Sequence, residues 1–272
     1  MSGDYVLGHS QAEHARLMRQ ARLLHPATRQ LLSDAGIGPG QRVLDIGAGV
    51  GDVSLLAGHM VGAGGYVCGV DADPAALATA RTRAKDEALA HVEFRVQDLN
   101  RLSLMEHFDA IVGRLVLMFF TPVSRLEVLK ALSALVRPGG VLVLQECSWQ
   151  AYFALAAHLP LHTACGELIC QSLRGAGAQP DMALPLHQQL ADAGWRVRQM
   201  CIHLPLAVAP ADPDWTADLL IALRARLQQQ ALDTAAVGEI ATLRARLQRE
   251  LAATRSFAPV LGLVGAIAVR DG

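Results

Sequence analysis

Three glycines and two aspartates lie at spacings that suit the binding of a nucleoside-containing cofactor. An apolar run ends near Asp45, and the turn Gly47–Gly51 leads into a helix that begins near Asp52. Such a strand–turn–helix has a backbone bare enough for a ligand to lie against it. The next apolar run ends in Asp71, where a carboxylate can accept hydrogen bonds from both hydroxyls of a ribose. The pattern predicts a cofactor that contains a nucleoside.

Position 52 separates two classes of such cofactors. A dinucleotide fingerprint reads Gly-x-Gly-x-x-Gly, and its third glycine permits close packing of the helix. Counted from Gly47, that position holds Asp52, and an acid beside a pyrophosphate would repel it. NAD or FAD is therefore the poorer prediction, although the spacing of Asp71 is compatible with either class.

Short apolar segments that alternate with helical ones must position these residues. The expected strands are short and often β-branched, and they cover Arg42–Ile46, Tyr66–Val70, Val92–Val96, Ala110–Val112 and Val141–Gln145. The expected helices between them cover Asp52–Met60, Pro74–Ala88 and Val123–Val136. This alternation predicts an α/β fold with a parallel sheet and helices on both faces.

Two regions outside this alternation could cover the carboxyl edge of the sheet, where ligands bind in such folds. Residues 4–35 have a helical pattern, and residues 149–180 are rich in alanine and leucine. For the last third we expect a helix over Leu186–Ala193, a strand over Arg196–Val208, helices over Trp215–Leu232 and Ala235–Arg255, and a strand over Pro259–Val269. The last two helices are amphipathic and predict a surface hairpin, which leaves a homodimer contact open.

Composition limits the class of protein. The 272 residues, 52% of them hydrophobic, fit one large α/β domain with additions. The 24 basic and 25 acidic residues lack the basic excess of most nucleic-acid enzymes. We find no membrane span, no signal-peptide pattern and no Cys-x-x-Cys pair among the five cysteines. We therefore expect a cytoplasmic protein with reduced thiols, no metal centre, and no membrane or nucleic-acid partner.

Five segments in this order resemble the motifs of the class I S-adenosylmethionine-dependent methyltransferases, in the form seen in small-molecule enzymes of the ubiquinone/menaquinone type. They are Val43–Gly51, Gly69–Asp73, Gln97–Leu99, Phe108–Met118 and Arg137–Leu142. The resemblance implies a Rossmann-like, seven-stranded, mostly parallel sheet with the last strand antiparallel, plus a helical cap. It implies an N-terminal helical cap (1–36), a cofactor-binding domain (37–148 and 181–272) and a helical substrate-cap insertion (149–180).

The resemblance also implies that S-adenosylmethionine is the cofactor. Asp71 should take the ribose hydroxyls, Asp98 and the amide of Leu99 should contact the adenine, and Asp45 should supply negative charge near the ammonium group. The residues predicted to bind the cofactor are Tyr5, Gln20, Asp45, Gly47, Gly49, Gly51, Asp71, Ala72, Asp98, Leu99, Gly113 and Arg114.

Fewer residues are candidates for the acceptor side. Glu146 directly follows the fifth expected strand. It is a candidate base or substrate contact, with an acid that caps a loop as the alternative. Met118 and Phe119 line an acceptor pocket or belong to the core. His158 and His162 lie four residues apart in the cap region, and one of them is a candidate general base, with a structural histidine as the alternative.

These patterns predict methyl transfer to a small, fairly apolar metabolite at oxygen, carbon or nitrogen, in bacterial secondary or quinone-type metabolism. Two alternatives stay open: a cyclase or isomerase that uses the sulfonium without methyl transfer, and a non-catalytic partner subunit. The fourth strand is not followed by Asn/Asp-Pro-Pro-Tyr/Phe and the chain has no Pro-Cys pair, which disfavours methylation of adenine, glutamine or cytosine. The cysteines suggest an arsenic methyltransferase, but their spacing gives no specific support.

Overall fold

A seven-stranded sheet forms the centre of the computed structural model, which describes residues 11–208 and 215–270. The strand order is β3-β2-β1-β4-β5-β9-β6. The strands are β1 (Arg42–Ile46), β2 (Tyr66–Asp71), β3 (Val92–Val96), β4 (Phe108–Arg114), β5 (Val136–Ser148), β6 (Arg196–His203) and β9 (Gly262–Val269). β9 pairs antiparallel with both β5 and β6, and the pairings among β1 to β5 are parallel. The predicted Rossmann-like, mostly parallel sheet with an antiparallel last strand is confirmed.

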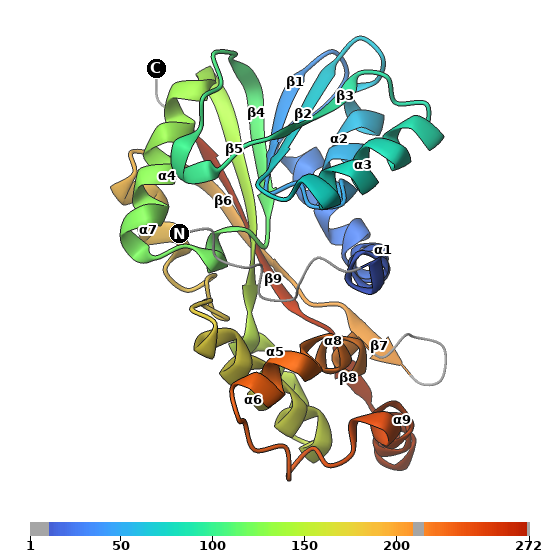
Figure 1. Cartoon of the computed structure of the whole chain (residues 1–272). Helices are drawn as coiled ribbons and strands as arrows, with labels where there is room; N and C mark the ends of the chain where they lie inside the picture. Colours follow the sequence, from blue (N-terminus) through green and yellow to red (C-terminus); the bar gives the residue numbers. More distant parts are fainter. Residues whose placement is uncertain (1–10, 209–214, 271–272) are drawn as a thin grey trace.

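Helices cover both faces of this sheet (Figure 1). They include α2 (Asp52–Val61) and α3 (Pro74–Asp86) on one side, and α4 (Pro122–Leu135) and α7 (Leu186–Asp192) on the other. Local chemistry sets where α3 and α4 begin. The Asp73 carboxylate accepts from the amide of Ala75, the Thr121 hydroxyl accepts from the amide of Ser124, and each helix has proline at its start.

The carboxyl ends of the central strands meet at one edge of the sheet. In register, Ile46 of β1 lies opposite both Val70 of β2 and Gly113 of β4, and Arg114 lies opposite Gln145 of β5. Strand order reverses between β1 and β4. Ligands bind outside the strand ends at such a reversal, because the loops after the two strands run in opposite directions and leave a crevice.

A second group of elements lies below this edge (Figure 1). It comprises α5 (Trp149–Ala156), α6 (Pro160–Gly175), α8 (Trp215–Gln229), α9 (Leu243–Thr254), and the two-stranded sheet of β7 (Leu206–Val208) and β8 (Phe257–Pro259). We call this group the cap layer. Because α8 and α9 pack beside α6, the layer draws on more of the chain than residues 149–180. The division into 1–36, 37–148 with 181–272, and 149–180 stays a prediction.

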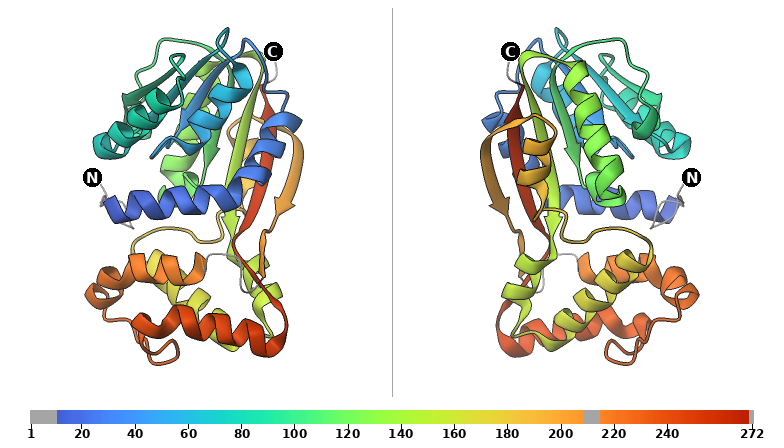
Figure 2. Two further views of the ribbon diagram at one scale, coloured as in Figure 1. Left: turned by 90° about the vertical axis from the view of Figure 1, so that its right-hand side faces the viewer. Right: turned by 90° about the vertical axis from the view of Figure 1, so that its left-hand side faces the viewer.

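Helix α1 (Gln11–Asp34) runs between the sheet and the cap layer (Figure 2). Its first half crosses the carboxyl edge, and its second half turns up along the sheet. Pro26 lies inside this helix. Proline lacks an amide hydrogen and its ring clashes with the preceding turn, so it bends helices. α1 therefore covers the edge where a ligand would bind.

Three predicted elements of the last third differ from the structure. The strand over Arg196–Val208 is wrong as one strand: β6 ends at His203, Pro205 follows, and β7 joins β8 instead. The helix over Ala235–Arg255 is wrong in its first half, since α9 begins at Leu243 after a short 3-10 turn. The predicted last strand is also divided, into β8 and β9. Further 3-10 turns cover Leu99–Arg101 and Leu117–Phe119.

Candidate functional site

The turn after β1 has all three of its glycines in the left-handed backbone region. The φ angles are 65° at Gly47, 52° at Gly49 and 90° at Gly51. A Cβ at Gly47 would lie 2.1 Å from Val116 Cγ2, and one at Gly51 would lie 2.9 Å from the Cβ of Ala80. A Cβ at Gly49 would meet nothing within 4 Å. Two glycines thus permit close packing, whereas Gly49 leaves bare backbone that a ligand can approach.

Asp71 joins this turn to the end of β2. Its Oδ2 accepts a hydrogen bond of 2.8 Å from the amide of Gly49, and its Oδ1 accepts one of 2.9 Å from the amide of Asp73. A carboxylate has about four acceptor positions, so each oxygen keeps room for one hydroxyl. Ala72 follows at the exposed rim. The carboxylate of Asp71, the open backbone at Gly49 and the exposed Ala72 could together hold a ribose.

Asp45 lies beneath the same turn and is almost fully buried, with 1% of its surface exposed. Its Oδ2 accepts a 2.6 Å hydrogen bond from the hydroxyl of Ser54 on α2. Burial raises the pKa of Asp45 to about 7, against the opposing effects of the Ser54 hydrogen bond and the Arg114 guanidinium. The hydrogen bond from Ser54 directs this carboxyl group to the helix below the turn.

A polar network ties the end of β4 to α1. Arg114 Nη1 donates to the Thr28 hydroxyl at 3.1 Å, and Arg114 Nη2 lies 4.0 Å from Asp52 Oδ2. The Thr28 hydroxyl donates to Gln145 Oε1 at 2.7 Å. Gln145 Nε2 is buried and has no hydrogen-bond partner in the part of the chain that the structure describes. Sequence reasoning missed Thr28 and Gln145, because Thr28 reaches Arg114 only when α1 packs on the sheet and Gln145 only through the pairing of β4 with β5.

The remaining predicted cofactor residues are less tightly grouped. Asp98 is exposed, and its Oδ1 accepts from the amide and side chain of Asn100, which holds its pKa below the usual range. Leu99 beside it is buried. Gln20 Oε1 accepts from Arg16 and from Nε1 of Trp215, so it links α1 to the cap layer. Tyr5 lies outside the described residues.

Glu146 is fully buried at the end of β5. Its Oε1 accepts from the amides of Val116, at 3.1 Å, and Leu117, at 2.8 Å. Burial raises its pKa to about 7, while those amides and Arg125 favour the charged form. Met118 of the same loop is 6% exposed and Phe119 is 37% exposed. The structure therefore places Glu146, Met118 and Phe119, of the predicted acceptor-side residues, near the strand ends.

The two histidines of the cap region bond to other partners. His162 Nδ1 lies 2.6 Å from Glu250 Oε2, and His158 Nε2 lies 2.6 Å from the Ser256 hydroxyl. Glu250 is in α9 and Ser256 follows it, in the part of the cap layer farthest from the sheet (Figure 1). These contacts join the start of α6 to the C-terminal part of the chain, whereas Glu146 is at the sheet edge.

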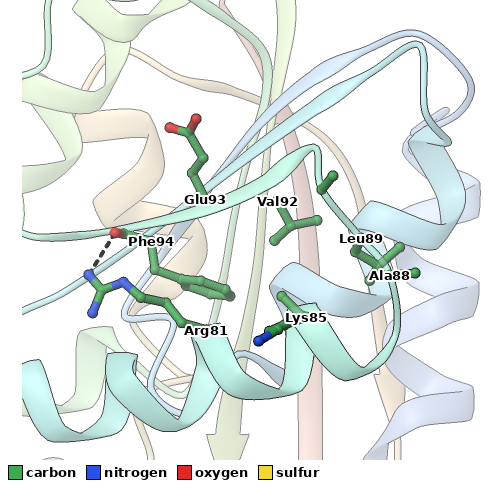
Figure 3. A pocket seen from close by; sticks show the side chains of 9 residues that line it. Arg81, Lys85, Ala88, Leu89, Val92, Glu93 and Phe94 are labelled. Carbon is green, nitrogen blue, oxygen red and sulfur yellow. Dashed lines mark hydrogen bonds between the residues drawn. The ribbon is translucent and has the colours of Figure 1, made fainter.

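One hollow of about 610 Å³ lies away from these residues, between α3 and β3 (Figure 3). Arg81, Lys85 and Phe94 are among its lining residues, and Arg81 donates to the carbonyl of Phe94 at 2.8 Å. None of the predicted site residues lines it. Across residues 11–208 and 215–270, no group of three or more His, Cys, Asp or Glu side chains could hold a metal ion. No described helix combines the length and apolar character that a bilayer span requires.

Comparison with known proteins finds a family and several relatives that this chain is similar to. Residues 43–140 match the family described as methyltransferase domain. An arsenite methyltransferase from Halobacterium salinarum is 26% identical over 190 residues, which are 68% of this chain and 44% of that protein. The ubiquinone/menaquinone biosynthesis C-methyltransferase UbiE from Ectopseudomonas mendocina is 32% identical over 116 residues, 42% of this chain and 44% of that protein. The chain thus spans under half the length of these relatives.

Solved structures share the fold at lower identity. The YcgJ protein from Bacillus subtilis aligns over 91% of this chain and 99% of its own, with a TM-score of 0.60 and 14% identity. The [4+2]-cyclase SpnF aligns over 90% of this chain and 81% of its own, with a TM-score of 0.54 and 16% identity. At such identities the likeness concerns the fold alone.

Proposed function

Because the chain belongs to the class I S-adenosylmethionine-dependent methyltransferases, we propose that it transfers the methyl group of S-adenosylmethionine to a small, fairly apolar metabolite at oxygen, carbon or nitrogen. The observation that carries the proposal is the hydrogen bond between Asp71 and the amide of Gly49. It joins a ribose acceptor to an open glycine backbone at the point where the strand order reverses.

The residues at this edge fit the parts of that cofactor. Asp71 and Ala72 suit the ribose, and the exposed Asp98 with the adjacent Leu99 suits the adenine. Gly49 gives a bare backbone for the amino-acid part, and Gly47, Gly51 and Gly113 allow close packing around it. The carboxyl of Asp45 lies beneath the turn and Arg114 lies beside it. Gln20 sits where α1 covers the edge. When bound, S-adenosylmethionine supplies a methyl group on a sulfonium for in-line displacement.

The protein's own contribution to such a transfer is to align the acceptor and exclude water. Next to the edge, Trp149 begins α5 and stacks against Trp215 of α8, with ring centroids 5.6 Å apart. Tyr152 packs on Trp149 at 5.1 Å. These three rings are 5% exposed or less and belong to the core beneath the edge. The support for a fairly apolar acceptor, of the kind found in secondary or quinone-type metabolism, is the apolar pair Met118 and Phe119 in the loop after β4. Of the predicted catalytic residues, Glu146 is the one at this edge.

Titration calorimetry with S-adenosylmethionine tests the cofactor. We expect binding by the wild type, and a loss of about 1.5–3 kcal/mol in Asp71→Ala, because a charge-assisted contact to the ribose is removed. Asp86→Ala is the matched control, since Asp86 is an exposed acid at the far end of α3. The proposal fails if the wild type does not bind the cofactor.

A second candidate function keeps the cofactor but not the methyl transfer. The structural likeness to a [4+2]-cyclase favours testing it, because the fixed charge of the sulfonium could assist a cyclisation or isomerisation. Turnover with release of S-adenosylhomocysteine supports methyl transfer, and turnover without release supports the cyclase or isomerase. Cofactor binding without turnover on any acceptor fits a non-catalytic partner subunit.

A further inference from the structure

The loop that follows β4, residues 115–120, has a backbone that must be held in place. Leu115 has a φ of 57°, in the left-handed region, although it is not a glycine. For a side-chain-bearing residue this conformation is unfavourable, so surrounding contacts must favour it. One contact is the hydrogen bond of 2.8 Å from the Leu115 amide to the carbonyl of Gln145.

The carboxylate of Glu146 accepts hydrogen bonds from the main-chain amides of this loop. Glu146 Oε1 accepts from both Val116 and Leu117, and the side chain is fully buried. Bonds from amides to a carboxylate are stronger than those to a neutral oxygen. Glu146 Oε2 is also buried, with no hydrogen-bond partner in the described part of the chain. The bonds that the structure assigns to Glu146 are thus to main chain.

The guanidinium of Arg125 donates hydrogen bonds to the main-chain carbonyls of the same loop. Arg125 on α4 is fully buried, and it donates from Nε to the carbonyl of Leu117 at 3.1 Å and from Nη2 to that of Phe120 at 2.7 Å. It also donates to the side chains of Gln179, at 2.8 Å, and Gln189, at 3.1 Å. Arg125 therefore connects the loop to α7 and to the segment that returns from the cap layer.

The loop in turn forms a wall of the candidate site. Val116 packs on the glycine turn so closely that a Cβ on Gly47 would lie 2.1 Å from its Cγ2. Two residues further on, the carbonyl of Met118 accepts from the amide of Gln179 at 2.9 Å. A shift of the loop would therefore move the contact with the glycine turn and the predicted acceptor residues together.

We propose that Glu146 and Arg125 are positioning residues that hold loop 115–120 in the conformation that closes the cofactor trough and shapes the acceptor pocket. Glu146 acts through the main chain of the loop, and its ionised form holds the two amides. The proposal rests on the proposed function, because the trough and the pocket are those of the S-adenosylmethionine site.

The charge state of Glu146 should make the position of loop 115–120 depend on pH. The titratable groups around it are Arg125 from α4, which favours the carboxylate, and Cys147 from β5, a buried thiol whose pKa is raised far above its usual value. The pKa of Glu146 is raised to about 7 by burial. A protonated carboxyl is a weaker acceptor than a carboxylate, so the hold on the loop weakens as the pH falls through about 7.

Two measurements on the full chain test this: calorimetry with S-adenosylhomocysteine, and hydrogen exchange of the amides of residues 115–120. The variants are Glu146→Ala, which removes the acceptor, and Glu146→Gln, which keeps an oxygen of the same shape without the charge. Glu127→Gln is the matched control, because Glu127 is an exposed acid on α4. Glu146→Gln decides the test if Glu146→Ala does not fold.

We expect exchange of the Val116 and Leu117 amides to speed up about tenfold or more in Glu146→Ala, with a similar loss of affinity, and a smaller change in Glu146→Gln. The affinity of the wild type should fall between about pH 8 and about pH 6, and Glu146→Gln should remove the part of that dependence that comes from Glu146, while the part that comes from Asp45 remains. Absence of wild-type binding would overturn the proposed function. Wild-type binding together with unchanged exchange and an unchanged pH profile in Glu146→Gln would overturn the role of Glu146 alone.

Discussion

Gly47 and Gly49 have similar backbone angles but opposite surroundings, so alanine at each should have a different effect. In Gly47→Ala the new Cβ would overlap Val116, and strain plus overpacking should cost about 2–5 kcal/mol of stability. In Gly49→Ala the space is open, and only the backbone cost of about 1–2 kcal/mol applies. That variant should instead lose affinity for S-adenosylmethionine.

Urea unfolding and calorimetry on both variants measure the two effects. Val116→Ala removes the overlapping methyl group, so it should restore part of the stability of Gly47→Ala in a double-mutant cycle. Equal loss of stability in the two glycine variants, or wild-type cofactor affinity in Gly49→Ala, would contradict the assignment of packing to one glycine and ligand approach to the other.

Asp45 makes stability depend on pH. Its pKa is raised from 3.8 to about 7 in the folded chain, so between those values the folded state binds more protons than the unfolded state. The free energy of unfolding therefore falls as the pH rises through this window and levels off above about 7. The total effect is about 4 kcal/mol at most. Glu146 adds an effect of the same sign.

Asp45→Asn should remove the Asp45 part of this dependence, because the amide cannot ionise and still accepts from Ser54. Urea unfolding at about pH 5 and about pH 8 measures it. We expect the wild type to be less stable at the higher pH and the variant to show a smaller difference between the two. An unchanged difference would mean that Asp45 is not the buried acid that titrates in this range.

At the residue scale, the sequence predicts what lies close along the chain. Asp71 was predicted from its place at a strand end, and its carboxylate does meet the glycine turn. The pairing of Arg125 with the loop was not predictable, because an arginine on an amphipathic helix usually faces water. Arg125 is instead fully buried, and only the tertiary fold shows that Glu146 approaches the same loop from another element.

At the scale of elements, the hydroxyl of Thr28 links α1 to the ends of two strands. Thr28 accepts from Arg114 and donates to Gln145, and its own surface is only 2% exposed. Thr28→Val keeps the shape of the side chain but leaves these two buried groups without that partner. We expect a loss of about 1–3 kcal/mol in the free energy of unfolding, together with faster hydrogen exchange over α1.

Thr82→Val is the matched control for this prediction. Thr82 is an exposed helical threonine on α3 whose hydroxyl donates to the carbonyl four residues earlier, as that of Thr28 does. Exposed substitutions usually change stability by less than about 0.5 kcal/mol. If both variants lose the same stability, the hydrogen bonds of Thr28 that link α1 to the strand ends do not contribute to the free energy of unfolding.

Elements were predictable where hydrophobic pattern and boundary residues agree. The limits of β1 and β3 match the prediction at both ends, since each is a short apolar run between turn residues. Residues 235–242 were predicted wrongly as helix because they are rich in alanine, which favours a helix. In the structure the Asp233 carboxylate accepts from the amide of Ala235, and Gly238 has a φ of 66°. Local hydrogen bonds of this kind compete with the helix.

At the scale of the whole molecule, the sheet and the cap layer share one core. A single cluster of buried apolar side chains includes Leu44 and Ile111 from the sheet, Leu24 from α1, and Trp149 and Leu220 from the cap layer. The sequence predicted a cap but could not show this continuity, because it depends on how α8 returns to pack against α6. A shared core favours unfolding of both layers together.

Glu250 offers a test of that cooperativity from the end of the molecule farthest from the sheet. Its carboxylate accepts from the amides of Leu161 and His162 and pairs with the His162 ring at 2.6 Å, so it holds the start of α6 against α9. Glu250→Ala should cost about 2–4 kcal/mol. If the layers unfold as one unit, hydrogen exchange by global opening should quicken in β4 and β5 as much as in α6.

The control variant is Glu167→Ala, because Glu167 is an exposed acid on α6. It should change neither the stability nor the exchange. Faster exchange confined to the cap layer would instead show a separate unit, and would support the predicted division of the chain into a cofactor-binding domain and a cap.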